Sequence, residues 1–420
     1  MKIFTQALLA GFFAAASGAS AQELMRYEAP CKAGASPFRQ TLVVLDEASV
    51  SPEPTGHPSH LRWTRPILDV ADLTGQPSAE RLLPRERLSI FLAKRATGDL
   101  APLFVGCSPS MDATEQERLK SDRSSISQFI FGSVEKEFET QRKAYDGAVR
   151  DAFGQVRRAV PTGDGPHRSG ALTGLLPALR TLSQTIDLSR GTPRIVILSP
   201  FDVSPESLTD VKTAREAGFA SGSAAGLDFR RAEIVGIGFS GAAGQHLQAY
   251  AEAFFLRSKG MVVGWRSDGL PQLPSPPNAV RIFGGVADYG DISAPVQIRI
   301  ATDSQGNLVN SWIEVTAGRS LASPISGKAI CRSKDACEVK GDGRLLGQAW
   351  NPEPKDRPVF DERFAWSGMR YFELSFQGPA GKVKISDPLV SGINLPTGSG
   401  GTRRVDAWTF DVRRTDEQQF

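Results

Sequence analysis

The sequence predicts a doubly wound α/β domain with a mainly parallel sheet, followed by a carboxy-terminal antiparallel β-sandwich domain. Continuous apolar runs, of which Leu42–Leu45 is the first, suit strands that are buried on both faces. These runs alternate along the chain with amphipathic helical patterns, as a parallel sheet covered by helices requires. Beyond a proline-rich stretch the helical period vanishes and short alternating runs follow, which is typical of an antiparallel β domain.

The composition is that of an ordinary globular protein. With 420 residues, the chain is long enough for two or three domains that each bury a core of their own. Its hydrophobic content is 40% and its charged content is 23%. A net charge of +3 gives no reason to expect nucleic acid or an anionic membrane as the main partner.

The amino terminus has the pattern of a secretory signal peptide over residues 1–21. Lys2 supplies a basic start, Ile3–Ala16 an apolar stretch, and Ala19–Ala21 the small residues of a cleavage site. A leading segment, residues 22–37, follows. No later stretch approaches the ~20 apolar residues of a spanning helix. We therefore expect the mature protein to be periplasmic or secreted, and not membrane-spanning after signal cleavage.

Four cysteines remain after cleavage, and an oxidising compartment favours disulfides. Of the three possible pairings we favour Cys31–Cys107 and Cys331–Cys337. The last two cysteines lie close together across a short polar loop, and the first pair would tie the leading segment to the α/β domain. A zinc site is not expected, because no histidine stands at ligand spacing from these cysteines.

The α/β domain is predicted to span residues 38–268, and its opening strand lies in Gln40–Val50. There the apolar run leads straight into Asp46 and Glu47, at the carboxyl end of the strand, where open α/β sheets place their ligand sites. The proline-rich stretch Ser51–Pro66 is predicted to be a loop, and its two histidines, His57 and His60, are expected to be solvated.

A strand pair and two helices come next. Arg87–Ala96 and Leu100–Cys107 predict strands joined by a tight turn, and Pro102 favours an edge position for the second. From Ile126 to Val156, apolar residues recur at helical spacing between charged ones, which predicts a long helix with one core-facing stripe. Ser169–Ser183 predicts a leucine-rich helix.

The remaining elements of this domain are buried strands and one amphipathic helix. The predicted strands are Arg194–Ser199, Glu233–Phe239 and Gly260–Trp265, and the predicted helix is Gln245–Lys259.

Residues 269–279 are predicted to be a proline-rich linker and residues 280–420 the β-sandwich domain. Four prolines fall within Gly269–Asn278. Short strands are predicted at Pro295–Ile300, Leu308–Val315, Tyr371–Phe376, Lys382–Ile385 and Val405–Arg413.

Three features of the first domain together resemble the von Willebrand factor type A (vWA) family. These are the strand TLVVLD that ends at Asp46, a hydroxyl residue at the start of the helix SGALTGLLPAL, and the strand RIVILS with Asp202 in the following loop. The resemblance covers roughly residues 37–266. It implies a metal-ion-dependent adhesion site, in which Asp-x-Ser-x-Ser, a threonine and a further aspartate bind a cation such as Mg²⁺.

Carried over residue by residue, the resemblance implies a degenerate site. Asp46 and Asp202 match, and the threonine position falls on Ser169 or Thr173. The two serine positions fall on Ala48 and Val50, which cannot bind a cation through their side chains, and Ser49 lies one residue out of register. No cofactor is therefore predicted, and Mg²⁺ or Mn²⁺ would bind only with substitute ligands. The structural alternative is that the two aspartates cap helices or accept from loop amides.

Enzyme signatures are sparse. Gly236–Gly241 matches the spacing Gly-x-Gly-x-x-Gly, but the region about 20 residues on supplies no acidic residue for a ribose. His167, beside Ser169, is the best candidate for a hydrolase built on Ser, His and a carboxylate. No catalytic residue is predicted.

The sequence thus predicts an exported, non-catalytic protein of the adhesion type that binds another protein, in the cell envelope or outside the cell, through the vWA-like domain. The first alternative is an exported hydrolase that uses His167 with a nearby serine and carboxylate. The second is a structural component of an envelope secretion or conjugation assembly.

Overall fold

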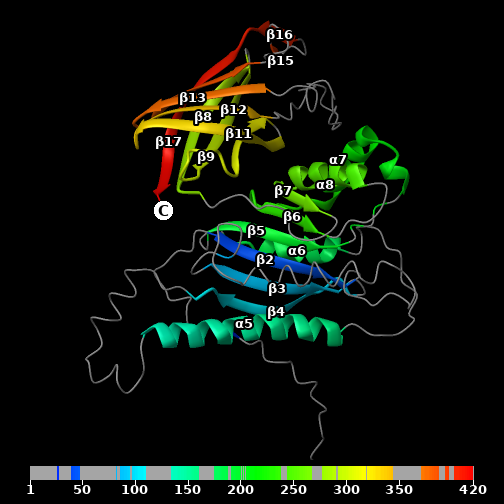
Figure 1. Cartoon of the computed structure of the whole chain (residues 1–420). Coiled ribbons are helices and arrows are strands. Elements are labelled where there is room, and N and C mark those ends of the chain that lie inside the picture. The colour runs from blue at the N-terminus through cyan, green and yellow to red at the C-terminus, as the bar shows by residue number, and fades with distance from the viewer. Residues whose placement is uncertain are drawn as a thin grey trace, which may run out of the picture.

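The computed structural model describes residues 26–27, 39–47, 82, 86–94, 97–109, 134–159, 175–187, 191–199, 201, 203, 205–237, 244–266, 277–289, 292–317, 319–343, 370–386, 393–396 and 402–419. Within them, a seven-stranded sheet with helices is followed along the chain by a closed eight-stranded antiparallel barrel (Figure 1).

The first sheet is mainly parallel, as predicted, with the strand order β1-β4-β3-β2-β5-β6-β7. Only β3 and β4 pair antiparallel, through the predicted tight turn. Outside β4 lies only the two-residue strand β1, opposite Val105 and Gly106, so Pro102 faces no outer strand in the described chain. The strands are β1 (Arg26–Tyr27), β2 (Arg39–Asp46), β3 (Arg87–Ala93), β4 (Leu100–Cys107), β5 (Thr192–Leu198), β6 (Glu233–Ile237) and β7 (Met261–Arg266).

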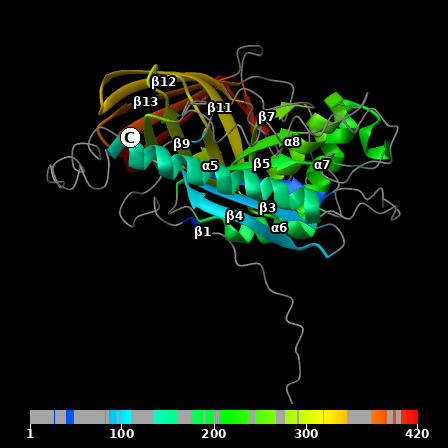
Figure 2. The ribbon, with the colours of Figure 1, turned by 60° about the horizontal axis from the view of Figure 1, so that its bottom comes forward.

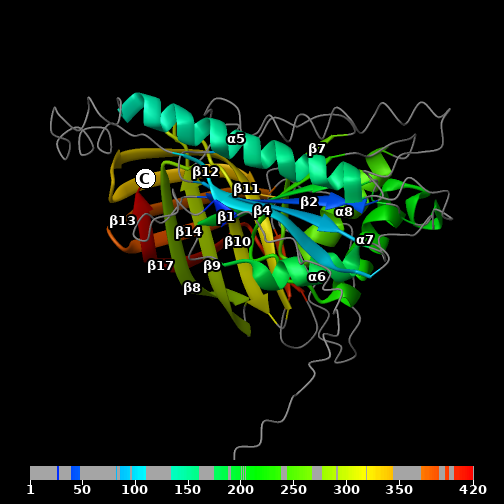
Figure 3. The same ribbon diagram turned by 90° about the horizontal axis from the view of Figure 1, so that it is seen from below.

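Helices cover both faces of this sheet. On one face α5 (Val134–Ala159) packs Tyr145 and Val149 against the strands. On the other face lie α6 (Leu176–Thr185), α7 (Val211–Ala225) and α8 (Gly244–Arg257), with the 3₁₀ turn η5 (Pro205–Leu208) before α7. Figures 2 and 3 show α5 and α6 on opposite sides of the strands. In the described part of the chain, no helix is both long and apolar enough to span a membrane.

Helix α7 is missing from the sequence-based prediction, because much of its buried face consists of alanine and glycine rather than large apolar residues. Those small residues let it approach α8 closely. A Cβ on Gly222 would lie 2.7 Å from the carbonyl oxygen of Phe254, and one on Gly218 would overlap the carbonyl oxygen of Tyr250. The two helices therefore pack backbone against backbone.

The second domain was predicted as a β-sandwich, and this prediction is wrong. Its sheet is a barrel with the order β10-β11-β12-β13-β14-β17-β8-β9, closed where β17 pairs with β8. Short alternating runs predict strands with one buried face, but they do not reveal whether the last strand returns to the first. The strands are β8 (Ala279–Tyr289), β9 (Ile292–Thr302), β10 (Ser311–Ala317), β11 (Arg319–Ser333), β12 (Ala336–Gly343), β13 (Arg370–Gln377), β14 (Ala380–Ser386) and β17 (Trp408–Gln419), with a hairpin of β15 (Ile393–Pro396) and β16 (Thr402–Val405) before β17.

The barrel interior is filled with side chains. Inward-facing residues of its strands form one apolar cluster, which includes Phe283, Ile298, Leu374 and Phe410. The barrel is therefore a packed core of its own, as an eight-stranded closure permits.

The close contact between α7 and α8 yields a first prediction. Gly218→Ala should lower the free energy of unfolding by about 1–3 kcal/mol, because the added methyl overlaps the Tyr250 carbonyl and forces the helices apart. Chemical denaturation of the full chain measures this change.

Gly147→Ala in α5 is the matched control, since nothing lies within 4 Å of an added Cβ there. It should raise the free energy of unfolding by about 0.5–1 kcal/mol through helix propensity. Equal effects of the two variants would contradict backbone-against-backbone packing.

Candidate functional site

The carboxyl ends of β2 and β5 carry a buried polar pair. Asp46, the last residue of β2, is fully buried, and Ser199 directly follows β5. Because Leu45 pairs with Leu198, the next residue of each strand comes to the same point of the edge. The Ser199 hydroxyl donates to Asp46 Oδ2 at 2.6 Å. This hydrogen bond joins the two central strands where the sequence places its candidate site.

Ser199 also fixes the turn that leaves the sheet. The Phe201 amide donates to Ser199 Oγ at 3.0 Å, and Phe201 has a φ of 50°, in the left-handed region that non-glycine residues rarely adopt. The buried ring of Phe201 packs against Phe255 and Trp265, at 5.7 and 5.5 Å between ring centres. The Ser199 hydroxyl and the packing of the ring together hold Phe201 in this left-handed conformation.

Of the predicted metal ligands, Asp46 is placed by the structure, whereas Ser49, Ser169, Thr173 and Asp202 lie outside the described residues. The metal site therefore stays a prediction. In the described chain, no group of three or more His, Cys, Asp or Glu side chains is arranged to hold a metal ion. Ser199 was not singled out from the sequence, although a hydroxyl residue at the end of a buried strand beside Asp46 was the available signal.

Of the four histidines, the structure describes His246. His57, His60 and His167 lie outside the described residues. In α8, Nδ1 of His246 lies 2.7 Å from the carbonyl oxygen of Leu208, at the end of η5, so this side chain joins α8 to the segment that follows β5. The hydrolase alternative, which needs His167, therefore stays a prediction.

The predicted disulfide Cys331–Cys337 is present. The two cysteines are directly opposite in the β11–β12 hairpin, next to an irregularity in the strand register. Cys107 is also disulfide-bonded. Its predicted partner, Cys31, lies outside the described residues, so that pairing stays a prediction.

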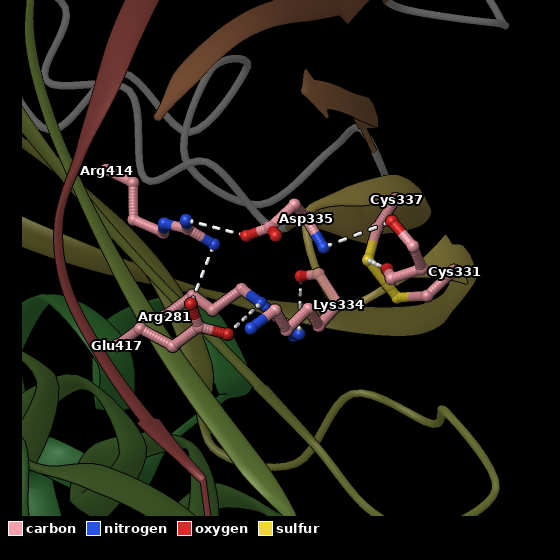
Figure 4. Close-up of a disulfide and its surroundings, with 8 residues drawn as sticks. Arg281, Cys331, Lys334, Asp335, Cys337, Arg414 and Glu417 are labelled. Atoms are coloured by element: carbon pink, nitrogen blue, oxygen red, sulfur yellow. Dashed lines mark hydrogen bonds and ion pairs between the residues drawn. A yellow bond between two sulfur atoms is a disulfide. The ribbon is translucent and has the colours of Figure 1, made fainter. Parts of the chain in front are cut away.

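The turn of this hairpin is held across the end of the barrel by ion pairs and hydrogen bonds (Figure 4). In β17, Nη2 of Arg414 lies 2.9 Å from Oδ1 of Asp335, and its Nη1 lies 2.7 Å from Oε2 of Glu417. Arg281 of β8 pairs with Glu417 at 3.2 Å and donates to the carbonyl oxygen of Lys334. In the barrel order, β11 and β12 stand opposite β17 and β8, so this network ties one wall to the other.

A row of buried charges crosses the amino ends of the strands, at the edge opposite Asp46. Arg39, the first residue of β2, forms two hydrogen bonds with Glu86, which precedes β3, at 2.9 and 2.8 Å. The Thr41 hydroxyl also donates to Glu86. Burial lowers the pKa of Arg39. The charge and hydrogen bonds of Glu86 raise it and together outweigh burial, so the net pKa lies above its ordinary value.

The row continues one strand further. Arg194 of β5 donates to Glu233 of β6 at 2.8 Å, between residues that the parallel ladder sets opposite each other. Burial lowers the pKa of Arg194; Glu233 opposes this and Arg39 adds to it, and the net pKa is lowered. This row was not predicted from the sequence, although a charged residue at or near the start of each apolar run was the available signal.

No protein-family model matches the chain, and no curated protein matches it. Among solved structures, it is similar to the crystal structure of the SpRpn10 VWA domain. That similarity covers 55% of this chain and 89% of that chain, with 10% sequence identity and a TM-score of 0.26. With a TM-score this low, the α/β assignment rests on the strand order and helix placement of this chain itself.

The buried row yields a second prediction. Glu233→Gln should lower the free energy of unfolding by about 3–5 kcal/mol, because it removes the carboxylate that faces the buried guanidinium of Arg194. Urea denaturation monitored by circular dichroism measures this change.

Glu373→Gln is the control, because its ion pair with Lys384 is partly exposed, with side-chain exposures of 30% and 51%. It should cost less than about 1 kcal/mol. If Glu233→Gln lowers the free energy of unfolding no more than Glu373→Gln does, the buried row does not stabilise the fold.

Proposed function

We propose that the chain is an exported, non-catalytic protein that binds another protein through the loops at the carboxyl ends of its parallel strands. The observation that carries the proposal is the Asp46–Ser199–Phe201 arrangement, which holds Phe201 in a left-handed backbone conformation where the chain leaves β5. Loops positioned by a rigid sheet are where open α/β domains place their binding sites. The vWA resemblance of the sequence favours the same edge.

The burial of these groups supports binding rather than catalysis. Asp46 is 0% exposed and Ser199 is 1% exposed. The Ser199 hydroxyl donates to the Asp46 carboxylate and accepts from the Phe201 amide, so both of its hydrogen bonds hold the backbone in place. A nucleophile would need access to substrate, which neither side chain has.

Two features support export to the periplasm or beyond. The first is the predicted signal peptide over residues 1–21. The second is the Cys331–Cys337 disulfide, since such bonds persist mainly in oxidising compartments. The partner would accordingly be another envelope or extracellular protein.

The proposed site is degenerate as a metal site. We expect the melting temperature of the mature protein to be the same in millimolar Mg²⁺, in millimolar Mn²⁺ and in excess chelator, because Asp46 Oδ2 already accepts from Ser199. Differential scanning calorimetry measures this.

A metal site that binds its cation would instead make the protein more stable when the cation is added. A cation at 100 times its dissociation constant would stabilise the protein by about 2.7 kcal/mol. A rise of that size that disappears in Asp46→Ala would show that substitute ligands bind the metal.

Site-directed photo-crosslinking tests the binding function. A photoreactive amino acid at Thr209, an exposed residue between η5 and α7 on the carboxyl side of β5, should give a discrete crosslinked protein in the intact cell envelope. The same group at Lys340, exposed on β12 of the barrel, is the matched control and should give none.

The adduct at Thr209 should also be lost in Ser199→Ala, which removes the hydrogen bonds that fix the turn. Equal adducts at the two positions, or none at Thr209, would contradict binding at this edge.

A further inference from the structure

The barrel meets the α/β domain at the amino ends of its strands. Arg231, just before β6, forms an ion pair with Glu314 of β10, and its guanidinium lies 5.0 Å from the centre of the Trp312 ring. Trp312 also packs against Met261, the first residue of β7. These contacts lie at the opposite edge of the sheet from Asp46.

Arg231 is held toward the barrel by an unusual backbone. Its φ is 66°, and that of Arg230 is 50°, both in the left-handed region. The Arg231 amide donates to the carbonyl oxygen of Lys259, in the turn that follows α8, which supports this conformation. The loop therefore presents the guanidinium to Glu314 and Trp312 at a cost in backbone strain.

A second arginine is buried at the same junction. Arg299 of β9 is 8% exposed, and it donates to the carbonyl oxygen of Asn310 and, at 3.3 Å, to the Thr192 hydroxyl at the start of β5. No carboxylate of the described chain forms an ion pair with it. Burial lowers its pKa to about 10, and the more distant Glu233 opposes this shift.

Docking therefore buries two guanidinium groups and forms one ion pair between the described parts of the two domains. Met261 and Trp312 form an apolar contact there, and α8 also contacts β11. Desolvating a charge is costly unless a counter-charge compensates it, and polar interfaces between domains allow relative motion.

We propose that the barrel docks reversibly on the amino ends of β5, β6 and β7, so that the protein in solution populates a docked and an undocked arrangement. Undocking separates Arg231 from Glu314 and returns Arg299 to water. The Asp46–Ser199 pair stays intact, because Asp46 ends β2 and Ser199 directly follows β5, at the edge of the sheet opposite the junction. This inference goes beyond the proposed binding function and does not depend on it, since it concerns the free protein.

Distance measurement between two spin labels on the full chain tests the proposal. Thr181→Cys in α6 and Thr409→Cys in β17 place labels at exposed positions, one on each domain. No cysteine of the described chain is a free thiol, and the protein without the two introduced cysteines, treated with the same label, is the control for reaction at Cys31. Pulsed electron–electron double resonance should give two populations of the distance between the labels in the labelled parent protein.

Two variants shift these populations in opposite directions. Glu314→Gln removes the counter-charge of Arg231 and should raise the undocked-to-docked ratio at least about tenfold. Arg299→Met removes a buried cation that has no ion pair in the described chain, and should lower the ratio. Glu373→Gln is the matched control for the first, because it removes a partly exposed ion pair between β13 and β14, far from the junction, and it should leave the ratio unchanged.

A single distance in the labelled parent protein that persists in Glu314→Gln would overturn the proposal and establish a rigid pair of domains. A rise of the ratio in Arg299→Met would also overturn it, because Arg299 would then stabilise docking. Should Glu314→Gln fail to fold by circular dichroism, the parent protein and Arg299→Met decide the question alone.

Discussion

Strands β2 and β5 lie at the centre of the sheet and pair in parallel, from Arg39 opposite Thr192 to Leu45 opposite Leu198. Both faces of this pair are covered, so a slip of one residue would turn every side chain to the wrong face. Val43 would leave the core under α5, and Val44 would leave the core under α8. Burial on two sides thus fixes the register, and the register decides which polar residues meet at each end of the strands.

The two ends use their polar residues differently. At the amino ends, charges meet in direct pairs that are sealed inside the protein, Arg39 with Glu86 and Arg194 with Glu233. Such pairs specify one alignment of neighbouring strands, since a shifted register would leave a buried charge without its partner. At the carboxyl ends, Asp46 and Ser199 form a pair that directs the chain out of the sheet. One edge therefore fixes the alignment of the strands, and the other positions the loops.

The barrel is built on a different constraint. Its strands follow one another around the sheet, and β17 closes it against β8, which removes every edge from the sheet. Arg281 and Arg414 connect these closing strands to the hairpin turn at Asp335 on the opposite wall (Figure 4). The interior is consequently packed and braced at one end, and the side of the barrel formed by β9 and β10 faces the α/β domain.

The mainly parallel sheet, the long helix α5, the β-rich second half and the Cys331–Cys337 bond could all be predicted from the sequence, because apolar period and cysteine spacing are local properties of the chain. Closure of the second sheet could not, since it depends on β8 and β17, which are more than 100 residues apart. The same holds for the Ser199 hydroxyl on Asp46 and for the charge row, which arise from strands that meet only after folding. Helix α7 was missed because glycine and alanine carry no apolar signal until α8 packs against them.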